Sequence, residues 1–140
     1  MALTARRLEE VLTRAKNEIL AAGRFRTPDC LARLNGEAPD RLKLRLQQAE
    51  AKGEIFSIEY QGQVHYPDYA FMDNEEECLL PALAEVIAVL HSTKDGWGMA
   101  FWFRSPNNFL RGLRPEDVLP QAPDAVLSAA SREVDDIMPG

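Results

Sequence analysis

The sequence has little of what catalytic and metal-binding sites need. Among 140 residues there are two cysteines and two histidines. Cys30 and Cys78 have no CxxC partner, so the sequence predicts neither a zinc ribbon nor a disulfide framework. His65 and His91 stand apart, with no H-E-x-x-H, G-x-S-x-G or phosphate-binding glycine motif nearby. We therefore predict no catalytic residues, no metal and no cofactor, and we expect a protein that is not an enzyme.

Long hydrophobic runs are also missing. Charged residues interrupt the opening MALTARRLEEVL, and the longest later apolar stretch, LLPALAEVIAVL, is broken by Pro81 and Glu85. These interruptions predict neither a signal peptide nor a membrane span, and we expect a cytoplasmic protein. The apolar fraction of 46% and the charged fraction of 27% are those of an ordinary globular chain that buries a core.

Positive charge is scarce in the second half. Residues 1–70 carry eleven Lys/Arg against ten Asp/Glu, whereas residues 71–140 carry five against twelve. Such a split favours two parts with different partners. We place the boundary at the acidic run DNEEE and predict one domain over residues 1–72 and another over residues 73–140.

An amphipathic helix is predicted over residues 4–22. Its apolar residues recur at helical spacing and share one face: Leu8, Val11, Leu12, Ala15 and Ile19. A short second helix is predicted to begin at Thr27-Pro28 and a third at Pro39-Asp40, each with proline at a favoured first position. The few residues between these two helices are typical of a helix-turn-helix unit.

Beyond these helices the apolar period changes to two. The segments EIFSIEY and QVHYPDY flank Gln61-Gly62 and predict a β-hairpin. Matching of apolar faces favours a three-residue loop that pairs Tyr60 with Val64 and Ile58 with Tyr66. The predicted fold class is mainly α with one β-hairpin (α+β), in which a winged-helix-like N-terminal domain precedes a small all-helical C-terminal domain.

After Phe71 we predict only helices and no strand. The run Glu75–Glu77 is interpreted as the acidic start of a helix, because adjacent carboxylates point to different faces and do not favour a metal site. Further helix starts are predicted at Ser105-Pro106, Arg114-Pro115 and Pro123-Asp124.

The third helix carries the clearest candidate for nucleic-acid contact. On the side away from its apolar face, four residues share one stripe: Arg41, Arg45, Gln48 and Lys52. Such a stripe fits a major groove, and arginines from neighbouring segments would add phosphate contacts: Arg24, Arg26 and Arg33. A solvated helix face shows the same spacing. The pI of about 4.9 lies below the usual range for a DNA-binding domain, so DNA binding would need a homodimer that doubles the basic face.

The segment 96–113, GWGMAFWFRSPNNFLRGL, contains both tryptophans. Over a helix from Gly98 to Arg104, the side chains of Met99, Trp102 and Phe103 share one side and are predicted to be core. The segment holds more large apolar surface than a small domain needs to bury, which predicts a protein-binding face. The candidate partner-binding residues on it are Asn107, Asn108, Phe109, Arg111 and Leu113.

The same region contains a longer pattern, W-x4-WF-x-SPN-x2-L-x-G-x2-P-x-D-x-L-x3-PD-x-V-x2-AA, which runs from Trp97 to Ala130. It resembles the toxin-binding C-terminal domain of the Xre/MbcA/ParS antitoxins. The upstream G-x-V-x-YPDYAF segment, Gly62 to Phe71, resembles the stretch that joins a DNA-binding module to that domain in some members.

The resemblance implies an antitoxin. Its C-terminal domain would bind a RES-type toxin that consumes NAD and block the toxin's active site, and its N-terminal half would bind the operon's own promoter. Two alternatives stay open: a transcriptional regulator without a toxin, and a protein-binding adaptor with no nucleic-acid partner.

Overall fold

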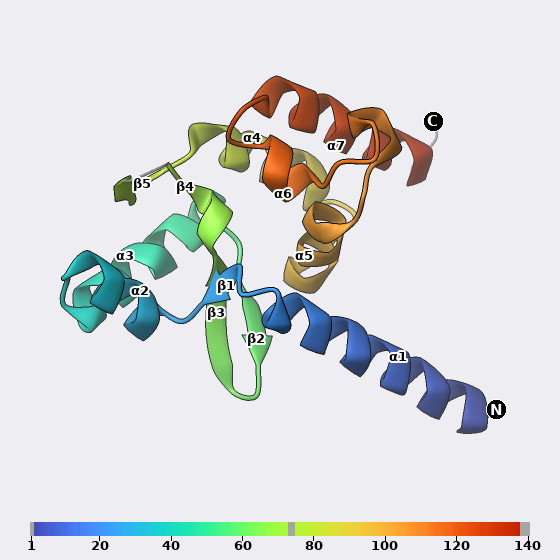
Figure 1. The fold of residues 1–140 in the computed structure, drawn as a ribbon, viewed down its shortest axis with the longest axis horizontal. Helices are drawn as coiled ribbons and strands as arrows, with labels where there is room; N and C mark the ends of the chain where they lie inside the picture. The colour runs from blue at the N-terminus through green and yellow to red at the C-terminus, as the bar shows by residue number, and fades with distance from the viewer. Residues whose placement is uncertain (1, 73–74, 138–140) are drawn as a thin grey trace.

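Helices dominate the fold and the strands are short (Figure 1). The computed structural model describes residues 2–72 and 75–137. In chain order the elements are α1 (Ala2–Ala21), β1 (Phe25–Arg26), α2 (Pro28–Asn35), α3 (Pro39–Ala51), β2 (Ile58–Tyr60), β3 (Gln63–Pro67), η1 (Asp68–Ala70), β4 (Phe71–Met72), β5 (Glu75–Leu79), α4 (Pro81–Leu90), α5 (Gly96–Arg104), η2 (Asn108–Leu110), α6 (Pro115–Val118) and α7 (Pro123–Ile137). The mainly helical α+β class predicted from the sequence is confirmed.

The helix-turn-helix pair forms as its end signals predict. The Thr27 hydroxyl accepts a hydrogen bond from the Cys30 amide at 3.3 Å and caps α2, which ends at Gly36 with a φ of 68°. A positive φ is readily adopted by glycine, so the chain turns there into α3. The apolar face of α3 is buried, as expected, through Leu42, Leu46 and Ala49.

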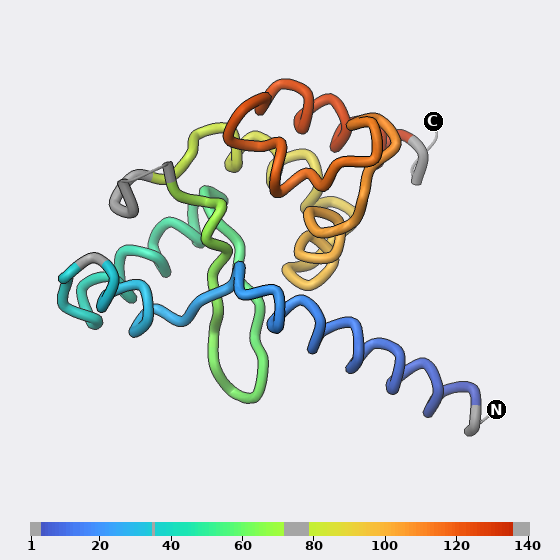
Figure 2. The backbone as a smooth tube through the Cα atoms, in the orientation of Figure 1, coloured from blue at the N-terminus to red at the C-terminus, as the bar shows by residue number. Residues whose placement is uncertain are grey.

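The first helix forms as predicted, but the N-terminal part of its apolar face is exposed. Every residue from Thr4 to Arg14 is exposed, and Leu8, Val11 and Leu12 have exposed fractions of 59%, 52% and 43%. Only the C-terminal turns reach the body, where Ile19 is buried. The apolar face of α1 is therefore uncovered over its first half, because α1 extends past the body of the molecule (Figures 1 and 2).

Three strands form an antiparallel sheet in the order β1-β3-β2. The register of the hairpin pairs Ile58 with His65, Glu59 with Val64 and Tyr60 with Gln63, so the predicted three-residue loop is wrong. The loop has two residues, Gln61 and Gly62, with φ values of 51° and 77°. Two successive positive φ angles fit the tight turn that matches strand twist, and this turn sets the register.

A second pair of strands follows the sheet. β4 and β5 run antiparallel, with Phe71 opposite Leu79. The prediction of no strand after Phe71 is wrong, and Glu75–Glu77 lies in β5 and does not cap a helix. The Leu80 amide donates to the Ala70 carbonyl at 2.8 Å, which closes this excursion of the chain. The rest of the acidic run, residues 73–74, lies outside the described residues.

The helices after residue 80 pack on one another and on the winged-helix part. α4 packs along α7, and α6 packs against both α5 and α7 (Figure 1). Phe103 in α5 is fully buried and stacks on Phe56 with ring centroids 5.9 Å apart. Its ring also lies 5.1 Å from that of Tyr69. One continuous apolar core therefore includes residues from both predicted domains.

Two other expectations concern helix boundaries. Pro115 and Pro123 begin α6 and α7 as predicted, but Ser105-Pro106 does not begin a helix. Ser105 instead ends α5, and a single 3-10 turn follows at Asn108–Leu110. Within the described ranges, no helix has both the length and the apolar character that a membrane crossing requires.

Candidate interaction surfaces

The predicted DNA-binding stripe on α3 is divided in the structure. Arg41, Gln48 and Lys52 are exposed. Arg45 is half-buried, and its Nη1 lies 2.6 Å from Oε1 of Glu37. A guanidinium held this way by a shielded carboxylate is poorly placed to reach a phosphate. The contact of Arg45 with Glu37 therefore holds the turn between α2 and α3 against α3.

The C-terminal part of the stripe adjoins the second pair of strands. A cavity of about 310 Å³ lies between the end of α3 and the strand residues Phe71 and Leu79. Gln48 and Lys52 line it together with Arg45. At the C-terminal end of α3, the predicted stripe therefore faces other parts of the chain. Arg41, at the start of the helix, does not line this cavity.

A different side of α3 faces the hairpin. Lys43 lines a cavity of about 240 Å³ with Gly62, Gln63 and Val64 from the hairpin, and with Thr27 to Asp29 from the start of α2. Lys43 is not among the candidate DNA contacts predicted from the sequence, because charge spacing alone placed that stripe on another side of α3. Its position beside the hairpin follows only from the folded chain.

Arg24 and Arg26 have intramolecular partners. The Arg24 guanidinium lies 2.8 Å from Asp68, 3.0 Å from Asp117 and 3.6 Å from Glu116, and it covers the Tyr69 ring at 5.4 Å. Arg26 Nη1 lies 3.9 Å from the Cys30 sulfur.

The charge cluster around Glu116 joins the two parts of the chain. Glu116 is 1% exposed, and its carboxylate is also 2.9 Å from Arg104 Nη1. A buried carboxylate is tolerated when cations and donors compensate its desolvation. Arg24, just before β1, and Arg104, at the end of α5, supply that positive charge. The pKa of Arg24 is raised: burial lowers it, but Asp68, Glu116 and Asp117 outweigh that effect.

The predicted partner-binding segment forms a hydrogen-bonded loop. The backbone N–H of Asn107 donates to the Leu113 carbonyl at 2.9 Å, and the backbone N–H of Gly112 donates to the backbone carbonyl of Asn107 at 2.8 Å. The Asn107 side-chain oxygen accepts from the Phe109 amide at 2.9 Å. Arg111 has a φ of 59°, which completes the reversal. Asn107 thus shapes the loop, and its side-chain oxygen is already used within it.

Two large apolar side chains project from this loop. Phe109 and Leu113 are 56% and 57% exposed. The Arg132 guanidinium of α7 lies 5.2 Å from the Phe109 ring, a cation–π distance. Asn108, Arg111 and Arg114 are exposed as well. The loop therefore presents apolar and cationic groups together on a rigid backbone, although this half of the chain is acidic overall.

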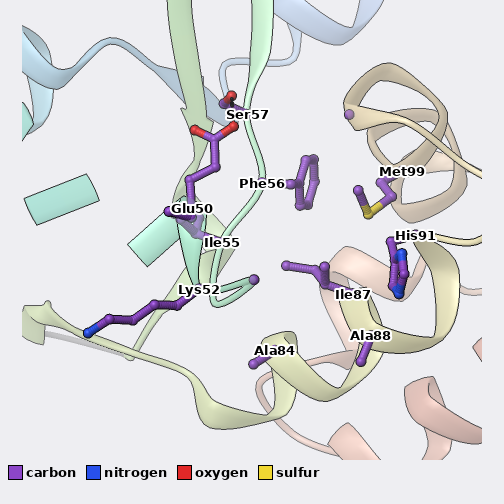
Figure 3. A pocket seen from close by; sticks show the side chains of 13 residues that line it. Glu50, Lys52, Ile55, Phe56, Ser57, Ala84, Ile87, Ala88, His91 and Met99 are labelled. Carbon is purple, nitrogen blue, oxygen red and sulfur yellow. Dashed lines mark hydrogen bonds between the residues drawn. The ribbon is translucent and has the colours of Figure 1, made fainter. Parts of the chain in front are cut away.

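A cavity of about 570 Å³ lies between the end of α3 and the helices α4 and α5 (Figure 3). Ile87, Phe56 and Met99 line it, and His91 stands at one side. Glu50 accepts hydrogen bonds from the Ser57 hydroxyl at 2.8 Å and the Tyr66 hydroxyl at 3.2 Å. His65 is not among the lining residues, so the two histidines do not form a common site here.

Comparison with known proteins adds one finding on the fold. The NMR structure of Rv2175c resembles this chain with a TM-score of 0.60 at 17% sequence identity, over 79% of this chain and 80% of that chain. At this identity the likeness shows a shared fold alone. Neither the protein-family models nor the curated proteins give a match to the chain.

Proposed function

We propose that the chain is an antitoxin-like regulator in which the winged-helix part contacts DNA and the loop Asn107–Leu113 binds a protein toxin. The observation that carries the proposal is the exposure of Phe109 and Leu113 on a hydrogen-bonded loop. Large apolar side chains that stay exposed on ordered backbone are typical of protein-binding sites, because their burial by a partner needs little further ordering.

The toxin proposed from the pattern in residues 97–130 is of the NAD-consuming RES type. The exposed cations Arg111 and Arg114 beside Phe109 fit a partner that offers carboxylates around an apolar pocket. Opposite charges at the rim of such a contact speed encounter and set its orientation.

Neutralisation of a co-expressed toxin tests this half of the proposal. The chain would be produced with a RES-type protein encoded beside it, and growth and complex formation would be measured. We expect Phe109→Asp with Leu113→Asp to abolish neutralisation without loss of fold, since both side chains are exposed. Val64→Asp, at an exposed hairpin position outside the loop, serves as the matched control. Neutralisation by the loop variant at the level of the control would refute the proposed site.

The DNA-binding half of the proposal rests on the exposed side of α3 and the hairpin beside it. Arg41 and Lys43 are the proposed phosphate contacts there. Binding to the chain's own upstream DNA would be measured by fluorescence anisotropy over a range of salt concentrations. Loss of each cation should lower the slope of log K against log salt by about one unit.

An adaptor without a nucleic-acid partner is the second candidate. It is favoured by the ion pairs of Arg24 and Arg45, two of the cations that the sequence predicted as DNA contacts. The anisotropy measurement separates the two candidates. Absence of binding at low salt, with a chain that still binds a toxin, would support the adaptor.

A further inference from the structure

The exposed apolar stripe on α1 is the feature that the proposed function leaves unexplained. Leu8, Val11 and Leu12 are each about half exposed, although they lie on one side of a helix that projects from the body (Figure 1). A helical segment as short as the projecting residues 4–14 is marginal in water on its own, so packing on a partner would be its main source of stability.

We infer that α1 packs antiparallel against α1 of a second copy of this chain, across a two-fold axis between Leu12 and Thr13. In this register the apolar stripes face each other near the axis. Leu8 of one copy lies within about 3 Å, along the helix axis, of Ala15 of the other, whose small side chain permits close approach of the two helices.

The charges beside the stripe support this register. Glu9 and Lys16 lie on one flank of the stripe, whereas Arg7 and Glu18 lie on the other. In an antiparallel pair each flank meets the same flank of its partner. Because residues 9 and 16 are equidistant from the proposed axis, Glu9 meets Lys16 of the second copy, and residues 7 and 18 are matched in the same way. Each cross-helix contact therefore joins opposite charges, and symmetry repeats both.

The remaining arginine beside the axis does not oppose this arrangement. Arg14 lies one turn from Glu10 and from Glu18 in its own helix, and both carboxylates offset its charge. Lys16 is held on its flank by Trp97, with the amine 5.0 Å from the ring centroid.

The attachment of α1 to the body favours the antiparallel over the parallel arrangement. Only the C-terminal turns of α1 touch the body, where Asn17 bonds to Tyr60 and Ile19 is buried. A parallel pair would bring two bodies to the same end of the helices, whereas an antiparallel pair places them at opposite ends. An isologous contact of this kind closes as a dimer.

Sedimentation velocity of the full chain from low micromolar to submillimolar concentration tests the inference. We expect a monomer–dimer equilibrium, and we expect Leu12→Glu to weaken the dimer by about 100-fold or more, because it places a charge in the apolar seam. Thr13→Glu adds the same charge on the outer side of the helix and should leave the dimer intact. A monomer at every concentration, or a Leu12→Glu dimer as tight as the Thr13→Glu dimer, would overturn the inference.

Charge reversal tests the register separately from folding. Arg7→Glu and Glu18→Arg should each weaken the dimer roughly three- to tenfold, because each creates two like-charged contacts. The double variant R7E/E18R restores opposite charges and should recover the original affinity. If the double variant binds no better than the single variants, the antiparallel register is wrong.

Discussion

The guanidinium of Arg24 lies 3.0 Å from the carboxylate of Asp117, although 93 positions separate the two residues in the sequence. Arg24 leads into β1 and Asp117 lies in α6, so one cation joins the winged-helix part to the C-terminal helices. Asp68 and Glu116 share the same guanidinium. Arg24, which the sequence predicted as a phosphate contact, therefore joins the two parts of the fold.

Arg24→Ala is expected to lower the free energy of unfolding by about 2 kcal/mol, since it removes three carboxylate contacts and the packing on Tyr69. Urea denaturation measures the change. Arg41→Ala, which removes an exposed arginine, should change it by less than about 0.5 kcal/mol. Equal stability of the two variants would show that the Arg24 contacts do not stabilise the fold.

Gly96→Ala tests the close approach between α5 and the hairpin. A Cβ at this position would overlap the backbone oxygen of Ser57, so α5 or the segment that leads into β2 must move. We expect a loss of about 2 to 4 kcal/mol in unfolding free energy. Gly98→Ala is the control: its Cβ would meet only side-chain atoms, at 3.1 Å or more, and the expected change is within about 1 kcal/mol. A fully stable Gly96→Ala protein would contradict this packing.

Trp102 and Phe109 lie close together in the sequence but differ in burial. Trp102 is 7% exposed and packs edge-on against Phe103, whereas Phe109 is 56% exposed. Thermal and urea unfolding should therefore show a loss of about 3 to 5 kcal/mol for Trp102→Ala and less than about 0.5 kcal/mol for Phe109→Ala. Similar losses for both variants would show that Phe109 also belongs to the core.

Local signals predicted the helices well because each end carries its own chemistry. Thr27 with Pro28, and Pro123 with Asp124, determine where α2 and α7 begin through contacts within a few residues. The division of Trp102 from Phe109 was also predictable, since helical spacing places Trp102 among core residues. These features depend on neighbours in the sequence.

The features that the sequence predicted wrongly depend on segments distant in the chain. The face-matching rule failed in the hairpin because both of its faces are contacted at its base: Tyr66 bonds to Glu50 of α3 on one side, and Ile58 adjoins Gly96 of α5 on the other. Likewise, the pairing of Arg45 with Glu37 depends on how the α2–α3 turn folds back. The exposure of Leu8 and Leu12 required the position of the body itself, because the same stripe is typical of a buried helix.

The hydroxyl of Tyr69 gives a prediction on alkaline stability. It is buried without a hydrogen-bond partner among the described residues, and burial, with the nearby Glu116 carboxylate, raises the pKa of Tyr69 well above its ordinary value despite the opposing charge of Arg24. Burial and Glu50 raise the pKa of Tyr66 as well. The unfolded chain releases these protons from about pH 10, while the folded chain keeps them. The stability contributed by both groups is therefore fully present below pH 10 and is lost as pH rises above it.

Tyr69→Phe separates this effect from packing. At neutral pH the variant should be as stable as the parent or up to about 1 kcal/mol more stable, because it removes a buried hydroxyl that makes no hydrogen bond among the described residues. Above pH 10 its unfolding free energy should fall less steeply than that of the parent, with a difference in slope of up to about 1.4 kcal/mol per pH unit.

Tyr66→Phe should also flatten the profile of unfolding free energy against pH, but it should cost about 1 kcal/mol at neutral pH because it loses the bond to Glu50. Urea titrations at several pH values measure both quantities. A Tyr69→Phe protein that is destabilised at neutral pH would show that the Tyr69 hydroxyl is hydrogen-bonded in solution, contrary to its unpartnered position in the structure.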